Sequence, residues 1–191
     1  TVKTCTRPGP FLLTLEGRAG AKYYDEGLNQ LGDFAPGQTL HALVDKWDEH
    51  VGVSALTEAA YRYALNNFKS NAADIAAGRA ALKETGNLVG LTMAQVQTAN
   101  NLITAAVNRQ TTQNYQLSSA KTLPTPLDMN SSTATLTGSR YGIAAAVTGG
   151  LTKAANYYNP STATPGINFA SDLAKDFTDG KIDGFSLDGK Q

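Results

Sequence analysis

Four aspartates near the end of the chain have the residue type and the spacing that could do chemistry. Asp172, Asp176, Asp179 and Asp183 would share one face of a helix if the helix continued that far. Carboxylates near the C-terminal end of a helix interact unfavourably with its dipole and repel one another. A bound cation would relieve both effects. We therefore name Asp176, Asp179 and Asp183 as candidate ligands of a calcium ion.

The residues after Asp176 are similar to part of a calcium-binding loop. Asp179–Asp183 reads DGKID, which matches the second half of an EF-hand loop. The first half departs from the pattern, because Lys175 and Phe177 stand where carboxylates are needed, and Ser186 replaces the bidentate glutamate. A complete EF-hand is therefore excluded, and an irregular calcium site stays open. The alternative is that the Asp-Gly pairs are turns in a solvated tail, with Gly180 ending the helix.

Two histidines are the other groups with catalytic potential. His41 lies in an alternating segment, and His50 follows Asp48 and Glu49. Zinc sites generally need three or four nitrogen or sulfur ligands, whereas the chain has two His and one distant cysteine, Cys5. The sequence has neither a Gly-rich phosphate loop after a strand nor a Gly-x-Ser-x-Gly elbow. We predict a non-enzymatic protein; a hydrolase would need a pocket where a histidine meets acidic groups.

The composition limits the classes of function. The 191 residues include 16 basic and 16 acidic side chains, and charged residues make up only 17% of the chain. An electrostatic nucleic-acid binder needs a clustered excess of Lys and Arg, so we expect no nucleic-acid partner. No run approaches the ~20 apolar residues that a membrane helix needs. The low charge and the many small polar residues favour an extracellular or cell-surface location.

A helix over residues 51–68 is expected to lie at the centre of the fold. Its polar residues fall on one narrow strip: Glu58, Arg62, Asn66 and Lys69. Because apolar residues cover nearly all the rest, this helix should be packed on several sides. Ser54 is the expected N-cap, and Glu58 precedes Arg62 by four residues, the favourable order for an ion pair.

More helices are expected after the central one. An Ala-rich helix over 71–84 should end at Gly86, and the next should begin at a capping box of Thr92 and Gln95 and run to about Asn108. The second has an apolar seam: Met93, Val96, Asn100, Ile103 and Val107. A buried amide needs partners, so the asparagine of this seam either sets the register between helices or subunits, or satisfies a loop backbone.

Beyond an irregular connection over 109–138, two final helices are expected. One covers 139–158, and the last begins at an N-cap formed by Asn168. The residues of the last helix that should face inward are Ala170, Leu173, Ala174 and Phe177.

The first part of the chain is expected to form short strands over Phe11–Leu15, Ala21–Asp25 and Gln38–Asp45. Gly32-Asp33 and Pro36-Gly37 are interpreted as turns. The predicted fold class is therefore mainly α with a small N-terminal β element (α+β), with about five helices packed as a bundle. The predicted domains are a β segment, 1–50, and a helical domain, 51–191, with an Asp-Gly-rich C-terminal tail.

Four short motifs occur in an order that resembles a known kind of module. They are LTLEG at Leu13–Gly17, YYDEG at Tyr23–Gly27, LTEAA at Leu56–Ala60 and DGKIDG at Asp179–Gly184. Their order resembles the α-helical modules of large, mostly uncharacterised surface and lipoprotein-like proteins of Gram-negative bacteria. The resemblance implies an extracellular, non-enzymatic protein and carries over no catalytic residues. Such modules often follow a β domain, so this chain is either one module of a larger protein or a subunit that completes its sheet with a neighbour.

The expected role is therefore structural or adhesive. A strand over Phe11–Glu16 with few partners in its own chain could add to a neighbour's sheet and build a head-to-tail filament. The residues expected to mediate assembly are Phe11, Leu12, Leu13 and Leu15. The partner would be another copy or a neighbouring β domain. The alternative is a monomeric ligand-binding module, stabilised by calcium.

Overall fold

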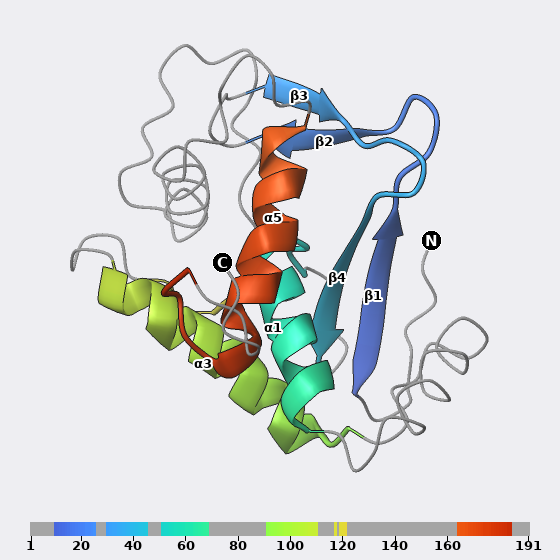
Figure 1. Ribbon diagram of the computed structural model, residues 1–191. Coiled ribbons are helices and arrows are strands. Elements are labelled where there is room, and N and C mark those ends of the chain that lie inside the picture. Colours follow the sequence, from blue (N-terminus) through green and yellow to red (C-terminus); the bar gives the residue numbers. More distant parts are fainter. Residues whose placement is uncertain are drawn as a thin grey trace.

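The computed structural model describes residues 10–25, 30–45, 51–68, 91–110, 117, 119–121 and 164–184. The strands in this part of the chain are β1 (Phe11–Glu16), β2 (Lys22–Asp25), β3 (Gln30–Asp33) and β4 (Thr39–Val44). The helices are α1 (Ala55–Asn67), α3 (Met93–Gln110) and α5 (Pro165–Asp176), and a short 3-10 helix, η2 (Phe177–Asp179), continues α5 (Figure 1).

The strands form two antiparallel ladders that continue each other as one bent ribbon. β1 pairs with β4, from Phe11 opposite Val44 to Glu16 opposite Thr39, and β2 pairs with β3. At the junction the Gly17 N–H donates to the Gln38 carbonyl oxygen over 2.8 Å. The β1–β4 end of the ribbon lies beside α1, and the β2–β3 end lies near the start of α5 (Figure 1).

Gly17 allows the bend because two main chains meet there. A Cβ at Gly17 would lie 2.0 Å from the carbonyl oxygen of Ala35, a distance that no side chain could tolerate. Gly20, in the same bend, has a φ of 78° and nothing within 4 Å of its Cβ position. The first glycine is therefore required for space and the second for its backbone conformation.

Helix α1 is the centre of the described structure, as predicted. It contacts β4, α3, α5 and η2. Ser54 is its N-cap, as predicted, and the Ser54 N–H donates to Thr57 Oγ1 over 2.8 Å. The main hydrophobic core includes buried residues from strands, helices and the turn after β3: Phe34, Leu40, Leu43, Leu56, Ala60, Val96, Ile103, Leu173 and Phe177.

The termini of the other two helices test further sequence predictions. Helix α3 begins as predicted, because the Gln95 N–H donates to Thr92 Oγ1 and the Thr92 N–H donates to Gln95 Oε1. The prediction that Asn168 caps the last helix is wrong, since α5 begins at Pro165, a residue suited to the first turn. Gly180 ends η2 with a φ of 86°, as predicted.

The prediction of about five helices packed as a bundle is wrong. In the ranges that the structure describes, three α-helices pack with four strands, and β4 supplies to the core a surface that a bundle would take from another helix. The helices predicted over 71–84 and 139–158 lie outside the described residues. None of the described helices is long and apolar enough to span a lipid bilayer.

Two smaller predictions also fail for identifiable reasons. Gly32 and Asp33, interpreted as a turn, belong to β3. Gly32 lies opposite Tyr23, and a Cβ there would be 2.6 Å from the tyrosine ring, so the ring takes the place of a side chain. Met93, assigned to the apolar seam of α3, is 47% exposed because it lies in the first turn of the helix, beyond the buried part of the seam.

Replacing Gly17 by alanine should destabilise the fold by at least about 2 kcal/mol, because the added methyl group collides with the main chain of Ala35. Gly20→Ala is the matched control and should cost only about 1 kcal/mol, for its positive φ. Urea denaturation followed by circular dichroism measures both. Equal losses of stability in the two variants would contradict the close approach at Gly17.

Candidate functional site

The most concentrated polar interactions surround β4, at the edge that faces away from β1. The buried carboxylate of Glu58, on α1, accepts a hydrogen bond from the main-chain N–H of His41 over 2.7 Å. The side chain of Asn100, on α3, donates through Nδ2 to the carbonyl oxygen of Leu43 over 3.1 Å. We call these two side chains, Glu58 and Asn100, the β4 clamp. Two helices thus bind main-chain groups that a neighbouring strand would otherwise bind.

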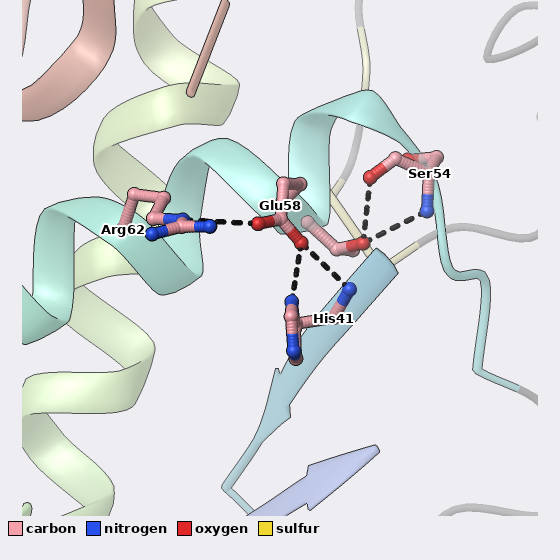
Figure 2. Close-up of polar contacts among 5 residues, drawn as sticks. His41, Ser54, Glu58 and Arg62 are labelled. Atoms are coloured by element: carbon pink, nitrogen blue, oxygen red, sulfur yellow. Dashed lines mark hydrogen bonds and ion pairs between the residues drawn. The ribbon is translucent and has the colours of Figure 1, made fainter. Parts of the chain in front are cut away.

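Glu58 also binds two side chains, as Figure 2 shows. Its Oε2 atom lies 2.7 Å from Nδ1 of His41, and its Oε1 atom accepts a hydrogen bond from Nε of Arg62 over 3.1 Å. The His41 ring stacks on Tyr61 with ring centroids 4.3 Å apart. The ion pair with Arg62 was predicted. Glu58 shares the narrow polar strip of α1 with Arg62, yet it is only 3% exposed and binds β4.

The start of α1 sets the position of Glu58. Thr57 Oγ1 accepts the Ser54 N–H and donates to the Ser54 carbonyl oxygen, which also accepts the Glu58 N–H over 3.0 Å (Figure 2). These capping hydrogen bonds fix the conformation of the first turn of α1. The Glu58 side chain is therefore held where it meets the middle of β4.

A histidine held by a carboxylate is also the arrangement that orients a catalytic imidazole. Here, however, the same carboxylate oxygen binds the His41 main chain, and the second oxygen binds Arg62. Among the described residues there is no group of three or more His, Cys, Asp and Glu side chains that could hold a metal ion. His50 and Cys5 lie outside the described residues. The geometry of the pair therefore fits a role in holding β4 to α1.

Asn100 is buried, as a seam residue should be, but its partner is a strand. Besides Leu43, Nδ2 donates to the Val96 carbonyl oxygen within α3, over 3.0 Å. Its Oδ1 atom is buried and is the one buried side-chain polar atom in the described part of the chain without a hydrogen bond. Such an unpaired acceptor costs stability. The amide thus holds α3 against β4, not against another helix.

Asp45, directly after β4, is a third link to the helices. Its carboxylate accepts hydrogen bonds from Gln97 of α3, over 2.8 Å, and from Lys121. Burial by itself raises the pKa of Asp45, but these two hydrogen bonds and the Lys121 charge outweigh it and lower the pKa from 3.8 to about 2. The link therefore stabilises the fold only while Asp45 is ionised.

A fourth buried group, Asp25, ends β2 beside the first turn of α5. Tyr23 donates its hydroxyl hydrogen to Asp25 Oδ2 over 3.0 Å. A Cβ on Gly166 would be 3.2 Å from the same oxygen, so the carboxylate lies close to the N-terminal end of the helix. A negative charge is favoured there by the free N–H groups and the helix dipole. This group was not predicted from the sequence, where the available signal was an acidic residue directly after two tyrosines in a predicted strand.

The acidic tail uses its carboxylates on its own main chain. Asp176 Oδ1 accepts hydrogen bonds from the Gly184 N–H, over 2.8 Å, and from the Asp183 N–H, over 3.4 Å. Asp179 Oδ1 accepts the Lys181 N–H over 2.9 Å. These bonds shape the turns after η2, as the alternative interpretation of the Asp-Gly pairs expects. The calcium site at Asp176, Asp179 and Asp183 stays a prediction.

Comparison of the chain with known protein families, with curated proteins and with solved structures finds no match. The resemblance to bacterial surface modules therefore stays a prediction.

Removing the Glu58 carboxylate should be the most damaging single change at this site. Glu58→Ala leaves the His41 N–H without an acceptor inside the protein, and we expect a loss of about 1–3 kcal/mol in the free energy of unfolding. Arg62→Ala is the matched control; it removes only the half-exposed partner and should cost less than about 1 kcal/mol. Denaturant titration of both variants measures the difference. Equal effects would mean that the exposed ion pair is the main role of Glu58.

Acid should weaken the Asp45 link in a defined range. Because the folded pKa of about 2 lies below the usual 3.8, ionised Asp45 adds stability above about pH 4, and this stability is lost as the pH falls towards 2. Asp45→Asn should therefore cost about 2 kcal/mol near neutral pH and little near pH 2. Asp33→Asn, at an exposed ion pair with Lys22, is the control and should cost under about 1 kcal/mol at any pH. A pH-independent effect of Asp45→Asn, measured by thermal unfolding, would contradict this account.

Proposed function

We propose that the protein is a non-enzymatic structural or adhesive module of an extracellular or cell surface, which associates through its N-terminal β element. The observation that supports a non-enzymatic role is the set of bonds that the Glu58 carboxylate makes. The one histidine–carboxylate pair in the described residues has both carboxylate oxygens engaged in bonds that hold β4, α1 and Arg62 together. A buried carboxylate that binds a main-chain N–H, an imidazole and a guanidinium at once joins the strand to the helix, which supports a structural role for the pair.

The β1–β4 ladder supports association through β1, but not by the strand exchange that was expected from the sequence. β1 is paired with β4 over its whole length, so donating this strand to a neighbour would first break that ladder. Adding a strand to the outer edge of β1 would leave the ladder intact. We therefore propose edge addition in place of strand exchange.

The composition of the chain supports the proposed surface location. Charged residues make up 17% of the chain, and the net charge is zero. A surface with few charges and many small polar groups favours contact with other proteins over contact with polyanions. The proposed location is measured directly by treating intact cells of the natural source with a protease and recovering the released protein from the cell exterior.

His41→Gln tests the non-enzymatic part. We expect the purified protein to show no turnover of chromogenic esters, phosphoesters or peptides, with or without the substitution, while the variant unfolds at lower temperature because its contacts with Glu58 and Tyr61 change. Tyr61→Phe, which keeps the ring stacked on His41, is the control for stability. Turnover that His41→Gln abolishes would overturn the proposal.

A further inference from the structure

The outward groups of β1 follow from the ladder it forms with β4. The Gly17 N–H donates to the Gln38 carbonyl oxygen, which makes this a hydrogen-bonded pair at one end of the ladder. Hydrogen-bonded and non-hydrogen-bonded pairs alternate along an antiparallel ladder. Leu15 and Leu13 therefore direct their main-chain groups to β4, while Leu12, Thr14 and Glu16 direct theirs away from it.

The β4 clamp gives the same assignment independently. The His41 N–H and the Leu43 carbonyl oxygen bind helix side chains, so both point away from β1. These residues lie opposite Thr14 and Leu12 in the register. Thr14 and Leu12 must then form non-hydrogen-bonded pairs with β4, and their own N–H and C=O groups point outward.

In the described part of the chain, the outer edge of β1 has few of the features that usually prevent pairing. The strand contains no proline, no lysine and no bulge, and its one charge, Glu16, is at its end. No hydrogen bond to the outward main-chain groups of Leu12 or Thr14 occurs among the described residues. Leu15 is 47% exposed. By contrast, the outer edge of β4 is closed by Glu58 and Asn100, so this ladder can be extended only at β1.

We propose that the outer edge of β1 binds β1 of a second copy of this chain, antiparallel about a two-fold axis at Thr14. This places Thr14 opposite Thr14 of the partner subunit and Leu12 opposite Glu16 of the partner subunit, and their outward groups exchange main-chain hydrogen bonds. The sheet then runs continuously in the order β4-β1-β1-β4. The inference rests on the proposed association through the β element and specifies its partner and register.

The face of β1 that carries Leu13 and Leu15 is self-complementary in this register, which is why the partner is a second copy. Exposed Leu15 lies opposite Leu13 of the partner subunit, so each copy covers an apolar side chain of the other. The two Glu16 carboxylates lie at opposite ends of the contact and do not face each other. Pairing an edge with an unrelated charged strand would leave Leu15 without an apolar neighbour.

The described helices leave room for this contact. β4 contacts both α1 and α3, and β1 lies on the side of β4 away from α1 (Figure 1). A strand added beyond β1 is therefore separated from these helices by the width of the ladder, about 4.8 Å per strand.

Edge-blocking substitutions test the contact. Thr14→Pro removes an outward N–H without removing a bond to β4, and Thr14→Lys places like charges opposite each other on the axis. We expect the unmodified protein to dimerise in analytical ultracentrifugation below about 1 mM and both variants to weaken dimerisation at least tenfold, with an unchanged circular dichroism spectrum. If Thr14→Pro fails to fold, Thr14→Lys decides. A monomer at about 1 mM, or folded variants that dimerise as tightly as the unmodified protein, would overturn the proposal.

Disulfide trapping tests the register. In a Cys5→Ser background, Thr14→Cys should form a cross-linked dimer on mild oxidation, because residues in a hydrogen-bonded pair have Cα atoms about 5.5 Å apart, within disulfide range. Leu12→Cys is the matched control on the same edge; it lies opposite Glu16 of the partner subunit and should not cross-link to its equivalent. Cross-linking that is no faster at Thr14 than at Leu12 would overturn the register.

The outcomes separate this inference from the proposed function. A monomeric protein without turnover leaves the non-enzymatic role standing and overturns the dimer. Turnover that depends on His41 overturns the proposed function whether or not Thr14 variants change the association.

Discussion

A strand that packs against helices must still bind every main-chain N–H and C=O group that it buries, and in this protein β4 depends on two helix side chains to do so. Glu58 accepts the His41 N–H, and Asn100 donates to the Leu43 carbonyl oxygen. An unpaired group at either position would cost about 1–3 kcal/mol. The positions of α1 and α3 relative to the ribbon are therefore set by hydrogen-bond geometry as well as by apolar contact.

Because buried polar groups need hydrogen-bond partners, the carboxylates that could suggest catalysis or metal binding are used here to hold the fold together. The Glu58 carboxylate is buried next to an imidazole, yet its oxygens bind a main-chain N–H and a guanidinium. The Asp45 carboxylate joins β4 to α3 and to Lys121, and Asp176 holds the turn at Gly184. Glu58 and Asp45 thus join segments that are distant in sequence, whereas Asp176 binds a main-chain group nearby in the chain.

The same constraint gives the β1–β4 ladder two different edges. Helix side chains close the edge of β4, whereas β1 is the outer strand of the ladder among the described residues (Figure 1), with Leu15 exposed. Growth of the sheet in one direction only favours a closed dimer about a two-fold axis over an open array at this contact. Such asymmetry between edges is a general way to limit pairing.

Local signals in the sequence determined a large part of the described structure. The caps at Ser54 and Thr92, the end at Gly180 and the strand at Phe11 depend on residues within a few positions of one another. The β3 strand was missed because Gly32 signals a turn locally, while its actual neighbour, Tyr23, comes from another strand.

Only the tertiary structure decided that Glu58 is buried and what the buried polar residues bind. Glu58 has the same helical periodicity as exposed Arg62, and nothing near it in sequence shows that His41 lies within reach. Asn100 and Leu43 are likewise brought together only when α3 packs on β4. Periodicity reports which face of an element is apolar, but a hydrogen bond between distant segments depends on how those segments are placed in space.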